Sequence, residues 1–222
     1  KMAKDNKIID KSSRAYKIAA GRGVMNLPNK LTIARMIMIP VFILFFYLNF
    51  AGHYFVALAV FAIASFTDLL DGKIARRYNL VTNLGKFLDP IADKVLVSSA
   101  LIVILTVPSY FTAFLGGWAM IVGGCCVVVI FARELIVSGF RMVAADAGIV
   151  IAADKIGKFK TVAQDISIIM LLLFGGFYEI FGGAVGVQVV NYIGLIMLAA
   201  AAILTVISGI NYIVKNIAVL KV

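Results

Sequence analysis

The sequence predicts an all-α, polytopic membrane protein with six transmembrane helices and both termini in the cytoplasm. Two observations exclude an ordinary soluble domain: 63% of the 222 residues are hydrophobic and only 14% are charged, with a mean hydropathy of +1.04. Soluble domains are about half apolar and about a quarter charged. A soluble nucleic-acid binder can carry a net charge of +10, but it does not need so many apolar residues, so no nucleic-acid partner is expected.

Six apolar stretches are long enough to cross a bilayer, which takes about 20 helical residues. They are residues 31–50, 54–70, 87–107, 115–137, 161–181 and 187–214. All 21 Lys and Arg residues lie in segments 1–35, 73–94, 133–160 and 215–221, and the short connections 51–53, 108–114 and 182–186 contain none. Because Lys and Arg stay on the cytoplasmic side, both termini and both long connections are expected there.

Residues 1–24 form a basic N-terminal segment ahead of one six-helix domain over residues 25–222. Its apolar residues Ile8, Ile9, Tyr16 and Ile18 favour an amphipathic juxtamembrane helix lying on anionic headgroups. A solvated tail or an expression-tag remnant is an equal alternative, because Met25 is suited to be a natural start.

Four aspartates are packed into one predicted helix–loop–helix. Asp68 and Asp71 lie three residues apart at the end of the second span, so they share a helix face. Asp89 and Asp93 lie four residues apart at the start of the third span, again on one face. The predicted connection 72–86 allows the two faces to oppose each other.

Carboxylates gathered at a membrane boundary need positive charge between them. Such oxygen ligands suit Mg²⁺ or Mn²⁺, and two ions about 4 Å apart can bridge a phosphate. A histidine-based metal site is excluded, because His53 is the only histidine. The alternative is ion pairing at the headgroup level with the basic residues nearby, Lys73, Arg76, Arg77, Lys86 and Lys94.

The segment reads Asp68-x2-Asp71-Gly72-x2-Ala75-Arg76-x8-Gly85-x3-Asp89-x3-Asp93. These eight positions over 26 residues resemble the signature of the CDP-alcohol phosphotransferases, a family with six membrane helices. The resemblance implies that Asp68, Asp71 and Asp89 hold two divalent ions, with Asp93 as general base and additional metal ligand. It also implies that Gly72, Ala75 and Arg76 contact the CDP group. Further candidates for CDP binding are Gly85, whose small size allows close approach, and Asn29, Thr32 and Arg35 at the cytoplasmic end of the first span. For the small residues among them, the alternative is a turn or close helix packing.

Longer stretches at 26–35, 84–94, 133–141 and 157–161 are similar to the branch of this family whose acceptor is glycerol 3-phosphate. The resemblance implies transfer of the phosphatidyl group from CDP-diacylglycerol to sn-glycerol 3-phosphate, with release of CMP. It places the enzyme among the lipids of a bacterial plasma membrane, with its active site on the cytoplasmic face. A homodimer is compatible with this class of protein, but nothing in the sequence specifies one.

Charge selects candidates for the acceptor phosphate, since glycerol 3-phosphate is a small dianion. Arg133 and Arg141 can bind a phosphate through guanidinium forks, while Lys158 and Lys160 supply point charges. The alternative is that these residues face lipid headgroups.

Two alternative functions stay open from the sequence. The first is the same chemistry with another acceptor, such as inositol phosphate, serine or another phosphatidyl lipid. The second is a divalent-cation transporter that uses the same acids. A transporter is expected to have acids near the bilayer midplane and inverted repeats, whereas these acids lie at one boundary and no clear repeat is apparent.

Overall fold

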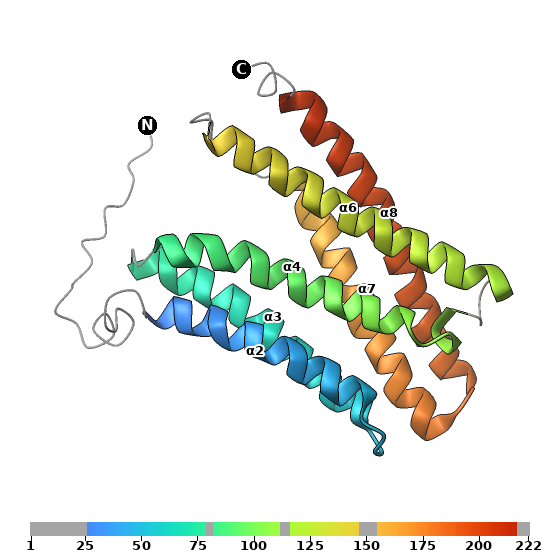
Figure 1. Ribbon diagram of the computed structural model, residues 1–222. Helices are drawn as coiled ribbons and strands as arrows, with labels where there is room; N and C mark the ends of the chain where they lie inside the picture. The colour runs from blue at the N-terminus through green and yellow to red at the C-terminus, as the bar shows by residue number, and fades with distance from the viewer. Residues whose placement is uncertain (1–25, 79–81, 112–115, 147–154, 217–222) are drawn as a thin grey trace, which may run out of the picture. The chain divides into compact units, whose positions relative to one another are not determined.

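The computed structural model describes residues 26–78, 82–111, 116–146 and 155–216, and its secondary-structure elements within these ranges are all helical (Figure 1). In chain order they are α2 (Leu27–Tyr47), α3 (His53–Tyr78), α4 (Asn83–Leu105), the 3-10 helix η1 (Gly116–Trp118), α6 (Ala119–Asp146), α7 (Lys155–Phe181) and α8 (Val185–Asn216). The predicted all-α class is confirmed. The basic segment 1–24 lies outside the described residues.

Five of these helices are long and apolar enough to cross a membrane. The qualifying segments are Leu27–Tyr47, His53–Ala75, Ala119–Ala144, Phe159–Phe181 and Val185–Asn216. The sequence predicted six spans, and within the described ranges α4 does not meet the same test. The reason is its N-terminal half, where Asp89, Asp93 and Lys94 interrupt the apolar run.

The helices expose large apolar side chains and bury many polar ones. Ile37, Val128 and Val214 are more than 60% exposed, at 62%, 65% and 64%. Arg35 and Ser208, by contrast, are completely buried. This distribution suits helices whose outer surface faces lipid, where no water rewards an exposed polar group.

Two helices extend further than the apolar pattern indicated. The second span was expected to end at Leu70, with a connection over 72–86, whereas α3 continues through Gly72 to Tyr78 and α4 begins at Asn83. Hydropathy marks only the part of a helix that lies in lipid. The residues after Gly72 include Ala75 and several Lys and Arg, which are good helix formers, so the helix does not stop at the glycine.

The described chain divides into two compact units. Unit 1 combines residues 26–42 with Val60–Leu96, and unit 2 combines Ile43–Ala59 with residues 97–216. Each of α2, α3 and α4 therefore contributes one end to unit 1 and the other end to unit 2. The four aspartates of the sequence motif all belong to unit 1, and the four candidate acceptor residues belong to unit 2.

Within unit 2, α7 packs closely along α8. Ser167 donates a hydrogen bond across this contact to the backbone oxygen of Gly194, at 2.9 Å. Gly194 is buried, and a Cβ at its position would lie 2.9 Å from side-chain atoms of Leu171 and 3.3 Å from that residue's backbone nitrogen. The missing side chain thus sets how near the two helices approach, as is common among membrane helices.

We predict that Gly194→Ala lowers the thermal unfolding temperature of the detergent-solubilised protein. The added methyl group meets Leu171, and overpacking costs about 1–3 kcal/mol, or roughly 3–10 °C for a chain of this size. Gly124→Ala in α6 is the matched control, because a Cβ there has nothing within 4 Å. The control should unfold at the wild-type temperature or higher, and an equal effect of both substitutions would contradict the role given to Gly194.

Candidate active site

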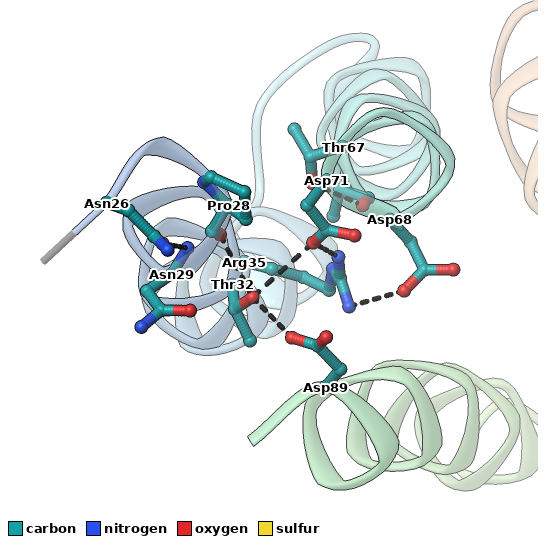
Figure 2. Close-up of polar contacts among 10 residues, drawn as sticks. Asn26, Pro28, Asn29, Thr32, Arg35, Thr67, Asp68, Asp71 and Asp89 are labelled. Atoms are coloured by element: carbon teal, nitrogen blue, oxygen red, sulfur yellow. Dashed lines mark hydrogen bonds and ion pairs between the residues drawn. The ribbon is translucent and has the colours of Figure 1, made fainter. Parts of the chain in front are cut away.

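The centre of unit 1 is the guanidinium group of Arg35, which α2 places between two carboxylates of α3 (Figure 2). Arg35 is completely buried. Its Nη1 lies 2.6 Å from Oδ1 of Asp68, and its Nη2 donates a hydrogen bond to Oδ2 of Asp71. A buried guanidinium is stable only with such partners, so these contacts join α2 to α3.

Thr32 extends the same cluster to α4. It lies three residues before Arg35, on the same face of α2, and it is completely buried. Its hydroxyl oxygen is 2.6 Å from Oδ1 of Asp89 and 3.4 Å from Oδ2 of Asp71. A hydroxyl has one proton, and the shorter distance assigns the donated hydrogen bond to Asp89. Three helices therefore meet at Thr32 and Arg35, as Figure 2 shows.

The aspartates differ in exposure. Asp71 is 3% exposed, whereas the side chain of Asp68 is 37% exposed and Asp89 is half-buried. Asp93 lies one turn after Asp89 along α4 and is exposed. Of the four aspartates predicted to oppose one another, Asp68, Asp71 and Asp89 contact the same two residues of α2, Arg35 and Thr32.

A second set of contacts fixes the start of α4 against α2. The Asn29 amide donates to Oγ1 of Thr82 at 2.8 Å, and the Thr82 hydroxyl donates back to Oδ1 of Asn29 at 3.0 Å. Oγ1 of Thr82 also accepts the backbone N–H of Gly85 at 3.0 Å, which is the usual helix N-cap bond. A Cβ at Gly85 would lie 2.8 Å from Oδ1 of Asn29, so the glycine is required for this close approach.

Several of the candidate CDP-binding residues have protein partners in unit 1. Arg35 and Thr32 contact the aspartates, and Asn29 contacts Thr82. Gly72 and Ala75 are half-buried within α3. The side chain of Arg76 is outside the described part of the chain.

The candidate acceptor residues form a second polar cluster, in unit 2. The Lys160 ammonium, on α7, is 5% exposed and donates a hydrogen bond to Oε1 of Glu134 on α6. Arg133 has its Nη1 3.4 Å from the same carboxylate oxygen, and its Nη2 donates to Oγ of Ser208 on α8 at 2.5 Å. These contacts bring Arg133 and Lys160 to one carboxylate.

Arg141 lies eight residues after Arg133, about two turns further along the same face of α6. Its Nε donates to the hydroxyl oxygen of Tyr212 at 3.2 Å, and its guanidinium carbon is 5.4 Å from the centre of that ring. The side chain of Lys158 is not described.

Sequence reasoning missed four residues that hold these clusters: Thr82, Glu134, Ser208 and Tyr212. Glu134 could have been identified from the sequence, since an acid inside an apolar helix needs a cation nearby. Thr82 could also have been identified, because a threonine three residues before Gly85 fits a helix N-cap. Nothing in the spacing of Ser208 and Tyr212 indicated that they would meet arginines of α6.

Among the described side chains, no group of three or more His, Cys, Asp or Glu residues is arranged to hold a metal ion as it stands. In unit 1 the positive charge between the carboxylates is the Arg35 guanidinium.

The chain matches known proteins over most of its length. The family model for CDP-alcohol phosphatidyltransferases matches residues 25–207. A CDP-diacylglycerol–glycerol-3-phosphate 3-phosphatidyltransferase of Bacillus subtilis is 39% identical over 211 residues, which cover 89% of this chain and 98% of the relative. The proteins of the same name from Rickettsia typhi and Shigella flexneri are 38% and 35% identical, over 84% of this chain and 94% and 92% of theirs. With its aspartate motif inside the matched region, the chain belongs to the CDP-alcohol phosphatidyltransferase family.

Proposed function

We propose that this protein transfers the phosphatidyl group of CDP-diacylglycerol to sn-glycerol 3-phosphate, producing phosphatidylglycerol phosphate and CMP. The relatives are named for this reaction, and the chain covers them almost completely. The observation that carries the proposal is the cluster of Asp68, Asp71 and Asp89 around Arg35 and Thr32 in a chain of this family.

The aspartates offer the type of ligand atom that binds a divalent metal ion. Their donor atoms are all carboxylate oxygens, the ligands that Mg²⁺ and Mn²⁺ prefer, and Asp68 is open enough to be reached from solvent. Asp68, Asp71, Asp89 and Asp93 would hold one or two such ions. When bound, the ions supply positive charge for the pyrophosphate of the donor and for the leaving CMP.

The remaining chemistry belongs to Asp93. The acceptor hydroxyl oxygen forms a bond to the phosphorus that carries diacylglycerol, and the bond from that phosphorus to the CMP oxygen breaks. CMP leaves with the bonding electrons, and the hydroxyl proton passes to a carboxylate oxygen of Asp93. An exposed carboxylate one turn from Asp89 is suited to this role, since the soluble acceptor must reach it.

The acceptor phosphate is assigned to the polar cluster of unit 2. Arg133 and Arg141 lie two turns apart on α6 and can offer guanidinium forks to a phosphate dianion. Lys160 and Lys158 add positive charge on α7, although Glu134 offsets the charge of Lys160. The CDP group is assigned to Gly72, Ala75 and Arg76 of α3, near the aspartates in sequence.

In the membrane we propose six crossings, with α4 as the sixth. Its residues from Val95 to Leu105 are without charge, and the five other helices already qualify as spans. Both termini and the aspartates would then lie on the cytoplasmic side, where the basic segments are expected and where a soluble acceptor is available.

Purified protein in lipid vesicles should release CMP only when CDP-diacylglycerol, glycerol 3-phosphate and Mg²⁺ or Mn²⁺ are all present. Release should stop when the metal is chelated and resume when it is restored, because the carboxylates then regain their cations. The assay is repeated with inositol phosphate and with serine. Turnover with either of these, and none with glycerol 3-phosphate, would reject the assigned acceptor while keeping the family chemistry.

Asp93→Asn should lower turnover by about 10²–10⁴-fold, the usual contribution of a general base, with little change in folding. The substitution keeps the shape of the side chain and removes its ability to take a proton. Glu179→Gln is the control: it is a similar change outside the aspartate motif, at a side chain that accepts the backbone N–H of Gly52. Full turnover by the Asp93 variant would show that another group removes the proton.

Arg35→Gln should lower the unfolding temperature in the absence of metal by about 5–10 °C, because Asp71 loses its buried counter-charge. Added Mn²⁺ should then stabilise the variant more than the wild type, since the ion replaces the missing charge. Lys160→Gln provides the comparison, as it breaks a buried ion pair outside the motif. It should lower the unfolding temperature without enlarging the Mn²⁺ effect. Equal stabilisation of the Arg35 variant and the wild type would contradict a metal site at these aspartates.

A further inference from the structure

The C-terminal half of α8 presents three residues to the arginines of α6. They are Ser208, Gly209 and Tyr212, and we refer to them as the α8 seat. All three are buried. They lie just beyond the family match, which ends at residue 207.

Ser208 sets the direction of the Arg133 side chain. Its hydroxyl oxygen accepts a hydrogen bond from Nη2 of Arg133 at 2.5 Å. A hydroxyl is a neutral acceptor, so it orients the guanidinium without cancelling its charge. The other terminal nitrogen of Arg133, Nη1, lies 3.4 Å from Oε1 of Glu134, the carboxylate oxygen that also pairs with Lys160.

Gly209 lets the stem of Arg133 lie against α8. A Cβ at this position would be 3.0 Å from Cγ of Arg133, which is tighter than normal packing allows. The absence of a side chain at Gly209 leaves room for the aliphatic part of Arg133, while Ser208 orients the guanidinium group.

Tyr212 does for Arg141 what Ser208 does for Arg133. Its hydroxyl oxygen accepts the Nε–H of Arg141, and its ring lies under the guanidinium, 5.4 Å away. The ring is itself held, packing with Val137, Phe140 and Ala144 of α6 and meeting Phe140 edge-on at 5.8 Å. A phenol and a ring face are neutral, so Tyr212 orients Arg141 without offsetting its charge.

We infer that Ser208 and Tyr212 are positioning residues that orient Arg133 and Arg141 toward the phosphate group of the acceptor. The inference rests on the proposed function, which assigns the two arginines to that phosphate. Two arginines two turns apart on α6 are each held by a hydroxyl group of the same neighbouring helix, so α8 orients both guanidinium groups. Glu134 lies 3.4 Å from Nη1 of Arg133 and offsets part of that charge, whereas the hydroxyl and ring of Tyr212 are neutral partners of Arg141.

Ser208→Ala should raise the KM for glycerol 3-phosphate by about tenfold, the expected cost of losing one hydrogen bond to a charged group. The kcat and the KM for CDP-diacylglycerol should stay within about twofold, since the hydroxyl touches neither the donor nor the reacting atoms. Tyr212→Phe should act in the same way through Arg141, and it keeps the ring in place if Ser208→Ala folds poorly.

The matched control is Ser167→Ala. Ser167 is as buried as Ser208 and also makes one hydrogen bond across a helix contact, but it is the donor and its partner is the backbone oxygen of Gly194. It should leave both KM values unchanged. Stabilisation of the protein by added glycerol 3-phosphate, measured by thermal unfolding, should fall for the Ser208 and Tyr212 variants only.

A double-mutant cycle separates positioning from general packing. In an Arg133→Lys background, Ser208→Ala should have little further effect on the KM for glycerol 3-phosphate, and the same should hold for Tyr212→Phe in an Arg141→Gln background. Effects that persist in these backgrounds, or that change both substrates equally, would overturn the inference. If Arg133→Lys and Arg141→Gln leave the acceptor KM unchanged, the failure is that of the proposed acceptor site. If the arginine substitutions raise the acceptor KM and Ser208→Ala and Tyr212→Phe do not, only the positioning role of Ser208 and Tyr212 is rejected.

Discussion

The contact between the buried guanidinium of Arg35 and the carboxylates of Asp68 and Asp71 is the interaction on which unit 1 depends. An ionised group removed from water is costly by several kcal/mol unless a partner of opposite charge is held beside it. Arg35 and Asp71 are both almost completely buried, so the contact between them compensates for their removal from water. The position of α2 against α3 is therefore tied to the same side chains that the family motif contains.

The membrane environment makes such polar contacts more important than they would be in a soluble bundle. Lipid tails are as apolar as leucine side chains, so burying leucine between helices contributes little to the stability of the helix contact. The helices instead expose apolar residues and place hydroxyls, amides and charges between them. Examples are the hydrogen bonds of Ser167 to Gly194, of Thr32 to Asp89 and of Asn29 to Thr82. At Gly194 and Gly85 the absence of a side chain also allows close packing.

The cations of the two polar clusters differ in the charge of their partners. Arg35 and Lys160 are paired with carboxylates, which cancel their charge. Arg133 also lies near Glu134 but donates its other Nη to a hydroxyl, and Arg141 meets only neutral groups of Tyr212 in the contacts described above. A cation that must bind an anion keeps more of its attraction when its partner is neutral. By this measure Arg141 keeps most of its attraction for an anion, Arg133 keeps part of it, and Arg35 and Lys160 keep the least.

The sequence by itself determined the helical membrane class, the aspartate motif and the family, because apolar length and residue spacing along one helix are local properties. It also predicted that the pair Asp68 and Asp71 would oppose the pair Asp89 and Asp93, since helix periodicity sets which residues share a face. Only the tertiary structure decided the partners: Arg35 between the carboxylates, Glu134 on Lys160, and Ser208 and Tyr212 on the arginines of α6. Those contacts join residues 26 to 75 positions apart in the sequence, and their geometry depends on how whole helices pack.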